Sequence, residues 1–284
     1  MLVLEIVAGR ILAPYVGVSL QTFTGIIGTI LAAIALGAWL GGKAADTNDP
    51  SKLLGPLLIV GGVLAVVSPA FVYVVGPTAA NESPWSIVFL AAVGFFLPAA
   101  VLSAVTPVVA KALLNSLDET GAVVGQLSAI GTAGALFGTF ITGFFLIAAM
   151  PSQPITWAVG AVLVVLGGYH TLRVGQRMIV AALVILALSI AGSAAIAAPC
   201  DHETAYSCAV IAERSDDASV KALVLDTFVN SVVDVDDPTY LGSRYARTID
   251  AVVASRGSSA SQQFVYVGGA GMTLPRFYQA TAGA

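Results

Sequence analysis

The sequence predicts a membrane all-α helical bundle of about seven transmembrane helices over residues 1–198, followed by a water-soluble α/β domain over residues 199–284. The chain is 57% hydrophobic and only 10% charged, whereas soluble domains carry roughly a quarter charged residues. Long apolar runs recur up to residue 198 and then stop. The net charge of −4 lies in the C-terminal part, and no basic stripe indicates a nucleic-acid partner. The lipid bilayer is therefore the first expected partner.

The predicted spans are the apolar segments 1–13, 22–40, 53–75, 86–110, 122–149, 155–172 and 178–198. The last of these holds no charged residue, and at about 1.5 Å per residue it is long enough to cross a hydrocarbon core of about 30 Å. The first is short, and we expect it to be the second half of a span whose start is missing. Pro98 and Pro107 interrupt the fourth span, which neighbouring membrane helices tolerate.

Small residues and two charges stand out within the spans. Glycines recur along the fifth segment at near-helical spacing, from Gly125 to Gly143, and we interpret them as a tight packing surface rather than a substrate path. Glu5 and Arg10 lie within the first span. They are expected to satisfy each other inside the bundle, and a substrate contact is the alternative.

Charged connectors set the expected orientation. The connectors after spans two, four and six carry Lys43 and Lys52, Lys111, and Arg173 and Arg177, respectively. The connectors after spans one, three and five carry no Lys or Arg. The positive-inside rule places the first set in the cytoplasm of a cell with an inner membrane. Seven crossings would then leave the C-terminal domain on the non-cytoplasmic side.

The C-terminal part has the composition of an α/β domain. Residues 205–213 and 222–225 are predicted strands, 240–255 a helix, and 264–267 a short buried strand. Gly268, Gly269 and Gly271 follow that strand and precede a helix expected from residue 273. A strand, a glycine-rich turn and a helix can hold a nucleotide or nucleoside, although a tight structural connection fits equally well.

Cys200 and Cys208 are the two cysteines of the chain. Two interpretations stay open: a disulfide in an oxidising compartment, or two small buried residues. No metal site is expected, because His202 is adjacent to Cys200 rather than suitably spaced for a shared ion.

Several ordered motifs resemble the bacterial fused major-facilitator/spermidine-synthase family. In the membrane part they are residues 4–14 and 36–46. In the C-terminal part they are residues 203–206, Leu225-Asp226 with Asn230-Ser231, Asp236-Asp237, Tyr245 and residues 264–271. The resemblance covers nearly the whole chain.

The resemblance implies a Rossmann-type, methyltransferase-like fold and transfer of an aminopropyl group from decarboxylated S-adenosylmethionine to putrescine. Gly268, Gly269 and Gly271 would line the nucleoside pocket, and Asp226 and Tyr245 would lie near the substrates. The nucleoside would be a co-substrate, no covalent cofactor is expected, and no catalytic residue is assigned. Ser207, Asn230, Ala246 and Arg247 depart from the family's residues, and the turn lacks its aspartate. The chain also ends before the family's later acidic residues, so the domain is expected to be incomplete.

Three functions therefore remain open. The first is a membrane-anchored aminopropyltransferase-like enzyme or its degenerate form, which would act in polyamine metabolism. The second is a transporter or binding module for a polyamine or another small solute. Because its spans amount to about half of a full facilitator, that module would need a homo-oligomer or a second half. The third is a non-catalytic membrane scaffold.

Overall fold

A computed structural model describes residues 1–114, 120–175, 178–255, 263–269 and 271–281. The chain divides into two compact units: residues 1–199 with 204–206, and residues 200–203 with 207–284. This division lies close to the boundary expected at residue 198.

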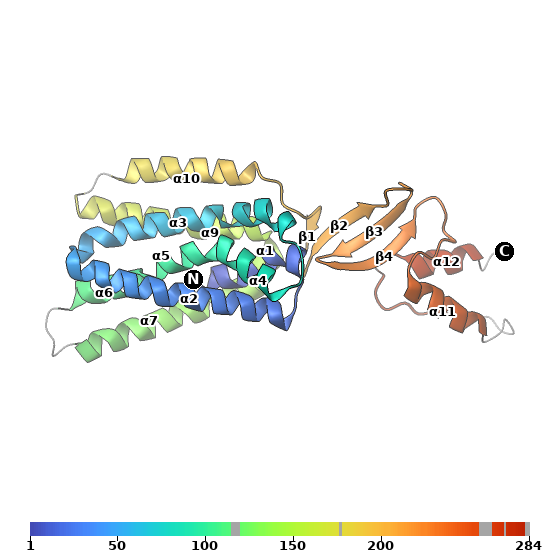
Figure 1. Cartoon of the computed structure of the whole chain (residues 1–284), viewed down its shortest axis with the longest axis horizontal. Coiled ribbons are helices and arrows are strands. Elements are labelled where there is room, and N and C mark those ends of the chain that lie inside the picture. Colours follow the sequence, from blue (N-terminus) through green and yellow to red (C-terminus); the bar gives the residue numbers. More distant parts are fainter. Residues whose placement is uncertain (115–119, 176–177, 256–262, 270, 282–284) are drawn as a thin grey trace. The chain divides into compact units, whose positions relative to one another are not determined.

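The first unit is helical throughout (Figure 1). Its helices are α1 (Leu2–Val16), α2 (Leu20–Thr47), α3 (Pro50–Val75) with the 3₁₀ turn η1 (Gly76–Thr78), α4 (Pro84–Ala91), the π-helical segment η2 (Ala92–Phe96), α5 (Leu97–Ser103), α6 (Val105–Leu113), α7 (Thr120–Ile141), the π-helical segment η4 (Thr142–Leu146), α8 (Ile147–Ala149), α9 (Ser152–Arg173) and α10 (Ile179–Ala194).

Side-chain caps fix where several of these helices begin. The Ser19 hydroxyl accepts a hydrogen bond from the Thr22 amide at the start of α2, at 3.1 Å. Asp49 caps α3 in the same way, with Pro50 as the first helical residue. Proline suits that position because its missing N–H would have no partner within the helix.

Within the part of the chain that the structure describes, five stretches of helix are long and apolar enough to cross a membrane: Leu20–Thr47, Pro50–Thr78, Pro84–Leu113, Thr120–Ala149 and Ser152–Arg173. They correspond to five of the seven predicted spans. The other two predicted spans also form helices, but these are short, with 15 residues in α1 and 16 in α10. The expectation of seven full crossings is therefore only partly met, because residues 195–198 leave the last helix early.

Two of the spans contain the same four-residue sequence, which overlaps a π-helical segment in each. Gly-Phe-Phe-Leu occurs at residues 94–97 and again at 143–146, and both copies overlap a π-helical segment. Phe95 in the first copy is buried in the main apolar core. Phe144, at the corresponding position of the second copy, is 69% exposed. The repeated sequence thus adopts a similar backbone in a buried and in an exposed setting.

Glycines bring α3 and α9 into close contact. A Cβ atom at Gly62 would lie 2.7 Å from the carbonyl oxygen of Gly160, and one at Gly160 would lie 2.5 Å from the carbonyl oxygen of Gly62. Glycine at these positions therefore sets the distance between the two backbones. Helices α2 and α5 also meet closely, and the Ser103 hydroxyl donates to the carbonyl of Ile34 at 3.2 Å.

Helix α7 is packed differently, because it lies at the edge of the bundle and none of its residues is buried (Figure 1). Cβ atoms at Gly125, Gly131, Gly134 and Gly143 would meet nothing within 4 Å. The tight packing expected for this glycine pattern is therefore wrong within the described chain. Gly138, the exception, would approach Val3 of α1.

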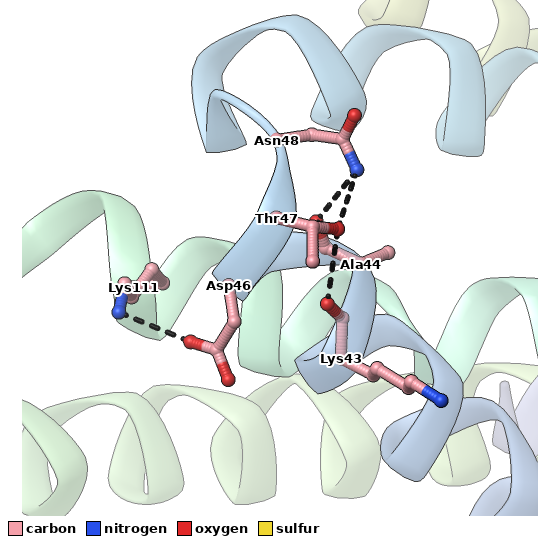
Figure 2. Close-up of polar contacts among 6 residues, drawn as sticks. All are labelled: Lys43, Ala44, Asp46, Thr47, Asn48 and Lys111. Atoms are coloured by element: carbon pink, nitrogen blue, oxygen red, sulfur yellow. Dashed lines mark hydrogen bonds and ion pairs between the residues drawn. The ribbon is translucent and has the colours of Figure 1, made fainter.

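Polar contacts hold one end of the bundle together (Figure 2). Lys111 at the end of α6 donates to the Asp46 carboxylate near the end of α2 at 3.0 Å. Asn48 caps α2 by donating to the Ala44 carbonyl at 2.9 Å. Since the C-terminal ends of α2, α6 and α9 lie together (Figure 1), Lys43, Lys111 and Arg173 belong to the same end of the bundle.

Arg10 has hydrogen-bond partners that lie far from it in the sequence. Its guanidinium group donates to the backbone carbonyls of Thr204 and Ala205, which belong to the same unit. The expected pairing of Arg10 with Glu5 stays a prediction, whereas the bonds to these backbone oxygens were not expected.

The second unit contains a four-stranded antiparallel sheet in the order β1-β2-β3-β4. Its strands are β1 (His202–Glu203), β2 (Cys208–Glu213), β3 (Val220–Leu225) and β4 (Phe228–Asp234), and they are followed by α11 (Arg244–Ser255) and α12 (Thr273–Thr281) (Figure 1).

The expected Rossmann-type parallel sheet is not seen among the described residues, and this corrects the predicted fold of the domain. Short connections join β2 to β3 and β3 to β4, and connections of this length can join only antiparallel neighbours. Residues 264–267, predicted to be a strand, pair with no strand. The helices expected at 240–255 and from 273 are both present.

Candidate functional site

The second unit contains a pocket of about 570 Å³. Its walls are α11, residues 264–269, the first turns of α12 and one residue of β4. The lining combines aromatic rings and apolar side chains with a few polar groups, and none of the described lining residues is charged. Pockets of this size and character are typical sites for small organic ligands.

An irregularity in β4 places a polar residue at the pocket. Leu223 of β3 pairs with Ser231, whereas the next residue of β3, Val224, pairs with Val229. Asn230 is therefore the extra residue of a β-bulge, and it lines the pocket. Bulges change the direction of side chains and occur often next to binding sites.

Aromatic rings form a stacked row along another wall of the pocket. The ring centroid of Phe264 lies 4.6 Å from that of Tyr278 and 6.2 Å from that of Tyr266, and both pairs are nearly parallel. Burial and the nearby Asp250 carboxylate raise the pKa of Tyr278 to about 12. Its hydroxyl group therefore stays protonated at neutral pH. This row provides a flat apolar surface with polar edges.

Along the chain, the glycine turn connects residues 264–267 to α12. Gly268 has φ +84°, a backbone conformation that glycine adopts without strain. A side chain at Gly269 would approach the sulfur of Met272. The amide of Gly271 donates to the Ser231 hydroxyl at 2.8 Å. The turn therefore exposes backbone at the pocket while it is fastened to β4.

The structure brings together three of the predicted site residues. Tyr245, Gly268 and Gly269 all line the pocket. Gly271 is next to it and bonds to the strand beneath. Asp226 is not among the lining residues: its carboxylate accepts a hydrogen bond from the Cys208 amide at 2.9 Å. Its predicted contact with substrate thus remains a prediction.

The two cysteines form a disulfide, Cys200–Cys208. The bond connects Cys200, the first residue of the second unit, to Cys208, the first residue of β2. Disulfides persist mainly in compartments outside the cytoplasm. This pairing agrees with the side of the membrane that the Lys and Arg distribution predicts for the domain.

A second cavity, of about 630 Å³, lies in the first unit between α2 and the span that begins with α4. Its walls are mostly apolar or small, with Gly25, Gly28 and Ala32 on one side and Val88 and Phe96 on the other, and its polar members are Gln21, Thr24 and Thr29. None of its described lining residues is charged. These residues therefore offer no carboxylate to a polyamine, which carries several positive charges.

The described lining of the second unit's pocket offers several groups that can bind a ligand. Its described lining contains no carboxylate, histidine or lysine that could move a proton. Among the described residues there is also no group of three or more His, Cys, Asp or Glu side chains that could hold a metal ion. Its recognition elements are the aromatic row, the Asn230 amide, hydroxyl groups and the glycine backbone.

Comparisons with protein family models, with curated proteins and with solved structures find no match to this chain. Sequence reasoning missed the aromatic row, although the alternation in Phe264-Val265-Tyr266-Val267 was a usable signal for two of its members. Tyr278 lies in a different helix, so only the folded chain brings it to Phe264.

Proposed function

We propose that this chain is a multi-pass membrane protein of the fused major-facilitator/spermidine-synthase kind, whose second unit binds an adenine nucleoside. The expected ligand is decarboxylated S-adenosylmethionine or its nucleoside product. The observation that carries the proposal is that Gly268 and Gly269, which the resemblance assigns to the nucleoside, and Tyr245, which it assigns to the substrates, line one pocket beside a row of aromatic rings.

The chemistry of a nucleoside fits the walls of this pocket. A purine base is flat and apolar on its faces, and aromatic side chains stack on such faces. Its edge carries donors and acceptors that the amide of Asn230 can match, because an amide offers both. A glycine turn lets the backbone approach the ribose closely. The pocket volume of about 570 Å³ lies within the usual range for such ligands.

The proposal commits to nucleoside binding and not to aminopropyl transfer. Binding a diamine and activating its nitrogen would require carboxylates, and the described lining of the pocket has none. The turn carries Gly271 where the resembled family has an aspartate. A pocket that binds the nucleoside without processing it agrees with both observations.

The binding test uses the full-length chain in detergent micelles and 5′-methylthioadenosine as the probe, followed by isothermal titration calorimetry. We expect saturable binding, and we expect Tyr245→Ala to weaken it by about fivefold or more, because a wall of the pocket is removed. Tyr206→Ala is the matched control, since Tyr206 is 90% exposed and is not a lining residue. Absence of binding at millimolar nucleoside would contradict the proposal.

We further propose that this unit lies on the non-cytoplasmic side. Lys43, Lys52, Lys111 and Arg173 lie in the connectors that the positive-inside rule assigns to the cytoplasm, and one further predicted span, which contains α10, follows them in the chain before the second unit; the disulfide supports the same side. Intact cells treated with a membrane-impermeant thiol reagent test this placement. Labelling of Cys200 and Cys208 is expected only after an impermeant reductant. If labelling required the membrane to be opened, the unit would be cytoplasmic.

A further inference from the structure

One buried hydroxyl group links the glycine turn to the sheet. Ser231 is 2% exposed, and its side chain accepts a hydrogen bond from the Gly271 amide at 2.8 Å. The two residues lie far apart in the sequence, so this bond defines the tertiary position of the turn. Ser231 directly follows Asn230, the bulge residue that lines the pocket.

The same contact explains why residue 271 has no side chain. A Cβ atom there would lie 2.5 Å from the Ser231 oxygen and 3.2 Å from a methyl group of Val233. The first distance is too short for any Cβ to tolerate without movement of the hydroxyl group. Glycine at position 271 therefore leaves the space that the Ser231 hydroxyl group occupies.

Two further bonds attach the start of α12 to β4 and to the residue that follows it. The Thr273 hydroxyl donates to the Val232 carbonyl at 3.2 Å, and the Arg276 guanidinium donates to the Val235 carbonyl at 3.3 Å. Ser231 and Thr273 are both buried, at 2% and 6% exposed. The Ser231 bond differs from the other two because its partner, Gly271, belongs to the glycine turn itself.

We propose that Ser231 is a positioning residue that fixes the glycine turn in the shape needed for the ligand. This role rests on the proposed nucleoside site for its consequence in binding, but the bond itself orders the turn in the absence of ligand. Removing the hydroxyl group leaves the Gly271 amide without its acceptor, and the turn gains freedom that ligand binding must then remove.

The experiment combines hydrogen exchange with nucleoside titration on the full-length chain in micelles. In Ser231→Ala we expect peptides that contain Gly271 to exchange about tenfold faster without ligand, and 5′-methylthioadenosine to bind about tenfold more weakly. Peptides from β2 and β3 should exchange as in the unsubstituted chain. Ser231→Thr keeps the hydroxyl group and should restore both values.

Ser219→Ala is the matched control, because its hydroxyl group bonds to Asp217 within an exposed turn. If Ser231→Ala does not fold, Gly271→Ala tests the same contact from the other side, and its Gly271-region peptides should also exchange faster. Unchanged exchange around residue 271 in the folded variant overturns the positioning role. Faster exchange with no nucleoside binding by the unsubstituted chain supports the positioning role and overturns the proposed function instead.

Discussion

Helices α3 and α9 use glycine in one way, and α7 uses it in another. In the α3–α9 pair, Gly62 and Gly160 lie so close that each excludes a side chain from the other. In α7, Gly125 and Gly131 face open space. In the sequence the two sets look alike, as small residues repeated along an apolar segment. Only the partner helix decides whether glycine permits contact or simply loosens the helix.

The difference is energetic as well as geometric. Glycine in a helix is less favourable than alanine by about 1 kcal/mol. Close backbone packing offsets that cost in α3 and α9, because removing the side chains lets the two helices form many short contacts. Within the described chain, no such gain accompanies Gly125 or Gly131. Substitutions at the two sites should therefore act in opposite directions.

The largest expected effect comes from Gly160→Leu. Its Cβ would lie 2.5 Å from the backbone oxygen of Gly62, which cannot move without separating α3 from α9. We expect a loss of about 3 kcal/mol or more, seen as a large fall in the midpoint of heat-induced unfolding in detergent. Gly131→Leu introduces the same side chain where nothing lies within 4 Å, and it should leave the midpoint within a few degrees. Equal losses would show that the two helices do not differ in packing.

A smaller effect of opposite sign is expected from Gly125→Ala combined with Gly131→Ala. Each alanine should stabilise α7 by about 0.5–1 kcal/mol, because it restricts the unfolded chain and its methyl group meets no neighbour. The midpoint of thermal unfolding in detergent should rise. Gly62→Ala is the counterpart in the packed pair and should lower it. A fall in the α7 variant would mean that those glycines contact something that the isolated chain lacks.

The sequence was informative where one physical property decides the structure. Apolar length alone located the five long spans, although the caps at Ser19 and Asp49 begin α2 and α3 a few residues before the predicted bounds. It was uninformative where distant residues decide. Residues 264–267 have the composition of a strand, yet they remain unpaired because no neighbouring strand is in place beside them. Strand β4 was not predicted, because Asn230 and Ser231 interrupt its apolar pattern.

The candidate site likewise contains residues that the local sequence indicates and residues that only the folded chain brings together. Gly268 and Gly269 could be singled out from the sequence, since a glycine pair between an apolar run and a helix marks a turn, and both line the pocket; their role in binding stays a prediction. Ser231 was not, because its importance depends on a bond to Gly271 across forty positions of sequence. Asp226 shows the reverse: a carboxylate that the resemblance marks for substrate bonds to the Cys208 amide instead.

The length of α10 gives the chain a dependence on its host membrane. Sixteen helical residues span about 24 Å, which is a few ångströms less than an average hydrocarbon layer of about 30 Å. A thin bilayer matches this helix directly, whereas a thick one must be locally compressed around it. We therefore expect acyl-chain length in the surrounding lipid to affect how readily α10 crosses the membrane, and with it the side on which the second unit lies.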